Sequence, residues 1–134
     1  NGCALPITPD KPFEPTGFMF VRNDSTYIYC NNGELDPMRG DTLTIDRYKG
    51  EVTYDVKFLD KDGNTLKDPD PLKYTIYVDV TNRSTIEDKK AFAGAYNFKV
   101  SFTPDEQGDT DFLFELKKDD KRILYVTGIP LHIL

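Results

Sequence analysis

The sequence has no tryptophan, one histidine, two cysteines and no long apolar run. No stretch approaches the roughly 20 apolar residues of a membrane-spanning helix, so we expect no direct insertion into a membrane. No signal peptide is recognisable in the sequence as given. A Ser or Cys nucleophile needs a base beside it, and His132 is the one imidazole. We interpret His132 as a half-exposed strand residue, and the sequence therefore favours a non-enzymatic domain without a cofactor.

Residues that bind metal are also scarce. Cys3 and Cys30 are far apart, and the sequence has neither a CxxC pair nor a second histidine, which excludes the common zinc patterns. The run 60–64, DKDGN, begins like a calcium loop. However, Thr65 stands where an EF-hand has glycine and Pro71 where it has glutamate. The sequence predicts no metal site and a solvated turn at 60–64.

Basic residues are too few and too scattered to bind nucleic acid. The chain has 17 Lys and Arg against 23 Asp and Glu, a formal net charge of −6, whereas nucleic acid is held by cations that neutralise phosphates. Hydrophobic residues make up 38% of the chain and include 9 Phe and 8 Tyr. This content is too high for a disordered chain and predicts a packed core.

The first 17 residues differ from the rest of the chain. Prolines stand at positions 6, 9, 12 and 15, a spacing that suits an extended path and excludes a helix interior. We therefore predict an extended arm or linker over 1–17 and one folded domain over 18–134.

Beyond the arm, apolar side chains recur at every second position, the period of a half-buried strand. Strands are expected at 18–22, 25–30, 42–46, 52–58, 72–80, 95–102, 112–116, 123–126 and 129–134. Residues 84–92 fit either a short helix that begins with a capping box or an irregular edge strand, and the resemblance described below favours the strand. The pattern predicts an all-β fold, an antiparallel β-sandwich of about seven to eight strands.

Two features of the sequence favour an extracellular location. Asn23-Asp-Ser25 and Asn82-Arg-Ser84 are glycosylation acceptor sequences, and both fall where loops or strand ends are expected. Cys3 and Cys30 are available to form a disulfide that would hold the arm to the domain. We therefore expect glycosylation at Asn23 and Asn82 and a Cys3–Cys30 bond. Two free thiols in a reducing compartment are the alternative.

Four segments, in order, resemble the immunoglobulin-like repeat of filamin. The run 94–108, GAYNFKVSFTPDEQG, is similar to the family's most distinctive stretch, in which an aromatic strand enters a Thr-Pro turn that ends in glycine. The other similar segments are 50–64, 72–80 and 128–133. The resemblance covers roughly residues 23–134. The departures are the proline arm and Ile129, which stands where the family usually has serine.

This resemblance implies an immunoglobulin-like sandwich that is not an enzyme and that has neighbouring domains in a longer chain. Filamin-type repeats bind partner peptides that add as a strand beside the third and fourth strands. In this sequence the groove would involve 72–80 and 84–88, with Thr75, Tyr77 and Ile86 as contacts. The alternative is a protected edge that binds nothing.

The function predicted from these features is a structural or protein-binding module of an extracellular or cell-surface adhesion protein. A cytosolic filamin-type repeat of an actin cross-linker is one alternative. Another is a carbohydrate-binding sandwich, which would need an exposed aromatic platform, for which Tyr27, Tyr29 and Tyr77 are the candidates. A bacterial surface lipoprotein with its lipidation junction at Gly2-Cys3 is a third alternative.

Overall fold

The computed structural model of the chain describes residues 12–82, 84–94 and 98–134. In this part, strands make up most of the chain, and the single helix is a 3₁₀ turn, η1 (Arg47–Lys49). The strands are β1 (Gly17–Arg22), β2 (Ser25–Asn31), β3 (Glu34–Leu35), β4 (Leu43–Ile45), β5 (Val52–Leu59), β6 (Tyr74–Val80), β7 (Ile86–Ala93), β8 (Phe98–Pro104), β9 (Gly108–Lys118) and β10 (Lys121–Ile133). Within the described residues, no helix has the length and apolar character needed to cross a membrane.

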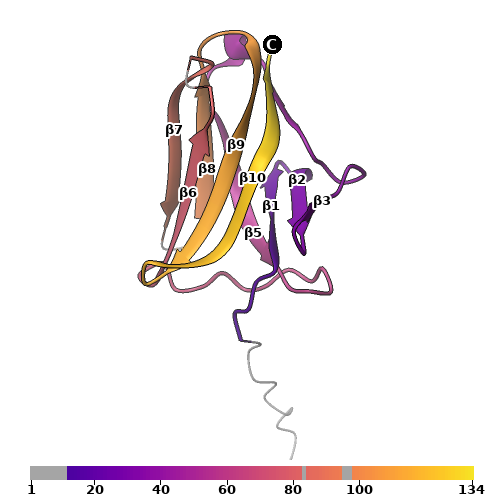
Figure 1. Cartoon of the computed structure of the whole chain (residues 1–134), viewed down its shortest axis with the longest axis vertical. Coiled ribbons are helices and arrows are strands. Elements are labelled where there is room, and N and C mark those ends of the chain that lie inside the picture. The colour runs from indigo at the N-terminus through magenta and orange to yellow at the C-terminus, as the bar shows by residue number, and fades with distance from the viewer. Residues whose placement is uncertain (1–11, 83, 95–97) are drawn as a thin grey trace, which may run out of the picture.

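The strands form two sheets packed face to face (Figure 1). One sheet has six strands in the order β3-β2-β1-β5-β8-β7, and the other has four in the order β4-β10-β9-β6. All neighbouring strands run antiparallel except β4 and β10, which are parallel. The predicted β-sandwich is therefore confirmed.

The strand order is immunoglobulin-like. β1, β5, β8 and β7 follow the order of strands A, B, E and D of that fold, while β6, β9 and β10 follow C, F and G. The described residues contain ten strands rather than seven or eight. The hairpin of β2 and β3 extends the first sheet, and β4 adds a short parallel strand beside β10.

Three hairpins owe their tight turns to residues that tolerate positive φ. Type I′ turns need positive φ at both central residues, and their twist matches that of the flanking strands. Positive φ occurs at the turn pairs Asn23-Asp24, Asn32-Gly33 and Asp119-Asp120. Asparagine, aspartate and glycine are the residue types that adopt this conformation most readily, so the sequence itself determines where these strands reverse.

The core follows the predicted alternation of apolar side chains. Every second side chain of β5, β6 and β8 faces the interior and is buried. Packing begins upstream of β1, because the Phe13 ring makes edge contacts with Phe58 and Tyr74 at centroid distances of 5.4 and 4.9 Å. Residues 1–11, which hold most of the predicted arm, lie outside the described residues.

Some local expectations are confirmed and others are wrong. The ambiguous segment 84–92 contains β7, so the strand prediction is correct there. The strand expected over 72–80 begins at Tyr74 instead, and Leu72, which precedes β6, is exposed. The two strands expected near the C-terminus form one, β10, whose register shifts between Val126 and Ile129 around Gly128.

Candidate functional site: the β6 and β7 edges

Four strands lie at the ends of the two sheets, and their free edges are the places where another chain can pair. Unpaired backbone groups at an edge invite pairing, and natural proteins protect them with short strands, lysine, proline, bulges or inward charges. β3 has two residues and β4 has three, so each offers little backbone to a partner. The two remaining edges, β6 and β7, have seven and eight residues.

β7 carries several of these protective features, whereas β6 carries few. In β7 the register shifts between Ile86 and Asp88, and Lys89 and Lys90 follow. β6 is a regular strand with no lysine or proline, and its pairing with β9 continues without a shift from Tyr74 to Val80. By these criteria β6 is the least protected long edge among the described residues.

The backbone groups that β6 offers follow from its pairing with β9. The Thr81 amide donates to the Asp111 carbonyl, and the Lys73 carbonyl accepts from the Asp119 amide. Hydrogen bonding alternates along an antiparallel strand, so the odd-numbered residues of β6 bond to β9. The amides and carbonyls of Ile76 and Val78, and the amide of Val80, therefore face the free edge.

β6 and β7 belong to different sheets but lie side by side at one side of the sandwich (Figure 1). An ion pair joins them: Lys89 Nζ of β7 lies 3.2 Å from Asp79 Oδ1 of β6. Lys89 stands opposite the buried Phe102 on β8, so its side chain leaves β7 on the face toward the core. Its ammonium group reaches the partly exposed side of the sandwich, where it meets Asp79. An inward-pointing charge of this kind is a known way to protect an edge.

The three predicted contacts lie on different faces. Thr75 and Tyr77 are on the outer face of β6, where Tyr77 is 47% exposed. Ile86 is only 5% exposed and belongs to the core, so its side chain is not available at the surface. Ile86 stands opposite Pro104 of β8, which is buried as well. Whether Thr75 and Tyr77 contact a partner remains a prediction.

Tyr77 belongs to a row of side chains that the sequence analysis missed. Glu115 on β9 stands opposite Tyr77 on one side and Tyr125 of β10 on the other. Glu115 is only 6% exposed although it lies on the outer face. Its carboxylate accepts a 2.7 Å hydrogen bond from Arg122 Nε and lies 3.5 Å from Lys117 Nζ, while the Arg122 guanidinium covers the Tyr125 ring at 3.7 Å.

The aromatic platform expected for a carbohydrate-binding domain is not formed by the three predicted tyrosines. Tyr27 and Tyr29 are on β2 of the six-stranded sheet, and Tyr77 is on β6 of the four-stranded sheet. Tyr29 is nearly buried and lies under the Arg39 guanidinium. The exposed tyrosine that shares a face with Tyr77 is Tyr125, which sequence alone does not place there.

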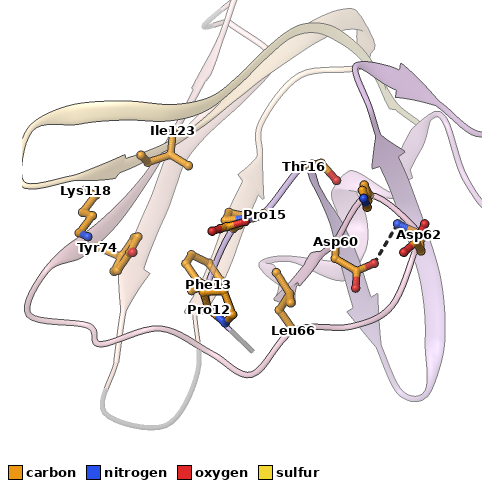
Figure 2. A pocket seen from close by; sticks show the side chains of 12 residues that line it. Pro12, Phe13, Pro15, Thr16, Asp60, Asp62, Leu66, Tyr74, Lys118 and Ile123 are labelled. Carbon is orange, nitrogen blue, oxygen red and sulfur yellow. Dashed lines mark hydrogen bonds between the residues drawn. The ribbon is translucent and has the colours of Figure 1, made fainter. Parts of the chain in front are cut away.

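A cavity of about 610 Å³ opens at the end of the sandwich where the chain enters β1 (Figure 2). Figure 2 shows Phe13, Leu66 and Tyr74 around it, with Lys118 and Ile123 contributed by the β9–β10 hairpin. Its volume lies within the range of small-molecule sites. The charged groups at its rim have both signs, so its chemistry does not specify a ligand.

His132 is placed as predicted, half exposed on a strand. Its Nδ1 lies 2.6 Å from Asp109 Oδ1 on β9, and Thr44 of β4 stands opposite it on the other side. Thr44, His132 and Asp109 have the residue types of a catalytic triad, with a hydroxyl nucleophile, a base and an acid. In the described part of the chain, however, no hydrogen bond joins Thr44 to His132, and the Asp109 side chain is 81% exposed to water.

The turn at 60–64 is held by hydrogen bonds to the side chain of Asp60. Asp60 Oδ1 accepts from the amides of Asp62 and Asn64, each at 2.9 Å, and the first of these bonds is dashed in Figure 2. Asp60 Oδ2 accepts from the Asn64 side chain. Within residues 12–82, 84–94 and 98–134, no group of three His, Cys, Asp or Glu side chains is arranged to hold a metal ion.

The predicted disulfide is not supported. Cys30 is a free cysteine, 1% exposed, whose side chain faces the core from β2. A bond to it would need a second sulfur inside the sandwich. Cys3 lies outside the described residues.

The two predicted glycosylation sites are on the surface. Asn23 is exposed in the β1–β2 turn, and Asn82 is exposed after β6. Asn82 Oδ1 accepts hydrogen bonds from the amide and the hydroxyl of Ser84, at 3.1 and 2.7 Å. The asparagine and the hydroxyl residue of this acceptor sequence are therefore held together. Arg83 between them lies outside the described residues.

No family model matches the chain, and no curated protein matches it. A filamin repeat is therefore not confirmed. Among solved structures, the chain is similar to domains 4 and 5 of the S-layer protein SbsC, with 15% sequence identity and a TM-score of 0.44. The match covers 71% of this chain and 48% of that one, so this chain spans about half of that structure's length. At this level of similarity, the immunoglobulin-like assignment depends on the strand order described above.

Proposed function

We propose that this chain is a non-enzymatic structural and protein-binding module of a cell-surface protein, and that β6 binds an extended strand of a partner. The observation that carries the proposal is the contrast between the sheet edges. Of the long edges in the described residues, β6 is the one without lysine, proline or a register shift. Strand addition uses such an edge, with main-chain hydrogen bonds for affinity and side chains for specificity.

The cell-surface part of the proposal draws support from the two exposed acceptor sequences at Asn23 and Asn82. The cysteines do not support a cell-surface location, because Cys30 is buried and free. A cytosolic location therefore stays the alternative, and glycosylation in a secretory cell distinguishes the two.

The test of strand addition uses peptides selected on the purified protein from a random library. An added strand bonds to the outward amides of β6, so we expect hydrogen exchange at Ile76 and Val78 to slow in the complex. Amides on the outer edges of β3 and β4 should be unaffected. Selected peptides that bind without protecting Ile76 or Val78, or a library that yields no binder, would overturn the proposal.

A carbohydrate-binding function is a second candidate because Tyr77 and Tyr125 are both exposed on one face, on either side of Glu115. Tyrosine rings stack on sugar rings, and polar neighbours bond to hydroxyl groups. The variants Tyr77→Lys and Tyr125→Lys separate the two functions. Strand addition should be weakened by Tyr77→Lys alone, since Tyr125 is on an interior strand, whereas glycan binding on an array should be lost with either substitution.

A further inference from the structure

At the C-terminal end of the β6 edge, one backbone amide is already bonded to a side chain of β6 itself. Asp79 Oδ1 accepts a hydrogen bond from the Val80 amide at 2.9 Å and also lies 3.2 Å from Lys89 Nζ. The Val80 amide faces away from β9, so an added strand would place one of its carbonyl oxygens there. Asp79 Oδ1 thus accepts from the amide that an added strand would use, and its ion pair with Lys89 also connects the two sheets.

Both charges are largely withdrawn from water. The side chains of Lys89 and Asp79 are each 22% exposed. Removing one partner of a desolvated pair leaves the other without compensation, which costs more than the pair itself contributes. A strand that displaces Asp79 from Lys89 must therefore supply another anion to Lys89, or bind weakly.

We propose that the Lys89–Asp79 pair is a latch on the β6 edge, and that the strand which opens it carries an Asp or Glu that takes the place of Asp79 beside Lys89. The inference rests on the proposed function of β6. A partner carbonyl accepts from the Val80 amide, and the partner carboxylate pairs with Lys89. Charge complementarity then selects for acidic partner strands and aligns them at one end of β6.

The test compares wild type with Lys89→Met, which keeps the aliphatic stem and removes the charge. The matched control is Lys99→Met, because Lys99 forms a similar pair with Asp55, at 3.7 Å, within the six-stranded sheet. A random peptide library is selected on each protein, and affinities are measured by fluorescence anisotropy. We expect peptides selected on wild type and on Lys99→Met to share an Asp or Glu at one position. Peptides selected on Lys89→Met should lack it.

Binding strength gives a second readout. A peptide without the acidic residue should bind Lys89→Met at least about tenfold more tightly than wild type, equivalent to about 1.4 kcal/mol. The double variant Asp79→Lys/Lys89→Glu reverses the pair, and peptides selected on it should be basic at the same position. If the double variant fails to fold, the comparison with Lys89→Met decides alone.

Each failure has a distinct meaning. Peptides that protect Ile76 and Val78 but bind wild type and Lys89→Met with equal affinity and equal acidic content would overturn the latch and leave the proposed function intact. A library that yields no peptide at β6 on any of the proteins would overturn both. Self-association of Lys89→Met through β6, seen by sedimentation velocity, would show that the β6 edge binds a second copy of the chain. It would overturn the proposal that the partner is an acidic strand.

Discussion

Phe18 of β1 and Phe114 of β9 stack across the interior, with ring centroids 4.0 Å apart and an interplanar angle of 22°. The two rings come from different sheets, and both side chains are fully buried. Phe20 makes further ring contacts with Phe112 and Phe114. Because aromatic rings contribute large buried areas and specific pair geometry, this cluster holds the two sheets in register.

Phe114→Ala should therefore lower the free energy of unfolding by about 3–5 kcal/mol, the usual cost of removing a buried ring. The chain has no tryptophan, so urea unfolding is best followed by circular dichroism. The control is Leu72→Ala at an exposed site, where the change should stay within about 0.5 kcal/mol. Similar losses for both variants would contradict the proposed importance of the ring cluster.

Cys30 should behave as an inert core thiol. Burial raises the pKa of its thiol above the usual value, and only the thiolate reacts with alkylating agents. In a Cys3→Ser variant, we expect iodoacetamide to leave the native protein unmodified and to label one site after unfolding in urea. Mass spectrometry reads the result. Labelling of the native protein at the rate of an exposed thiol would contradict the buried position.

The fold was predictable because most strands of this chain bury one face. Tyr54, Val56 and Phe58 alternate with polar residues along β5, and the buried set matches the expectation. An alternating pattern does not fix where a strand ends when glycine or proline interrupts it. Two separate strands, 123–126 and 129–134, were expected near the C-terminus, but a register shift lets β10 continue past Gly128 and Pro130.

The candidate site was less predictable because it depends on pairing between strands. The sequence pattern places Tyr77 on an outer face, but only the register of β6, β9 and β10 brings it beside Glu115 and Tyr125. The contact between Lys89 and Asp79 joins strands of different sheets. No spacing along the chain encodes such a contact, because it depends on how the sheets pack.

The hydrogen bond between Arg122 and Glu115 should contribute measurably to stability. Glu115 is buried on the outer face, and its strongest contact is the 2.7 Å bond from Arg122 Nε. We expect Arg122→Met to lower the free energy of unfolding by about 1–2 kcal/mol. Lys117→Met is the matched control, because the Lys117 ammonium lies farther from the same carboxylate, at 3.5 Å against 2.7 Å for Arg122 Nε, although both cations are partly exposed. It should therefore cost less than about 1 kcal/mol. A larger loss of unfolding free energy with Lys117→Met than with Arg122→Met would show that Lys117, and not Arg122, makes the more stabilising contact with Glu115.

Glycosylation should occur at both acceptor asparagines when the chain passes through a eukaryotic secretory pathway. Asn23 and Asn82 are exposed, so a glycan at either position can extend into solvent without disturbing the core. Asn23→Gln and Asn82→Gln should each remove one glycan, read as a mass shift that a glycosidase abolishes in wild type. Ser84→Ala should match Asn82→Gln, since the Ser84 hydroxyl contacts the Asn82 side chain. An unmodified wild type would argue against this prediction.

Asp68 gives the chain a predictable dependence on pH. Its side chain is mostly buried in the loop between β5 and β6, beside Lys57, and its Oδ1 is buried without a hydrogen-bond partner. Burial is the main cause that raises the pKa of the Asp68 carboxyl, while Lys57, 3.7 Å away, opposes the shift. The folded state therefore holds this proton more tightly than the unfolded state does, and it loses stability as pH rises through the raised pKa.

Asp68→Asn cannot ionise, so it avoids the cost of burying a charged carboxylate and should be more stable than wild type at pH 7. The advantage should vanish as pH falls below the ordinary Asp pKa of about 3.9, because the wild-type carboxyl is then neutral too. Lys57→Met provides the control: it removes the opposing charge, so it should lower stability at pH 7 and have little effect at the acidic end. Urea unfolding of the three proteins across this range checks the prediction. An Asp68→Asn variant less stable than wild type at pH 7 would show instead that the pair with Lys57 outweighs the cost of burying the carboxylate.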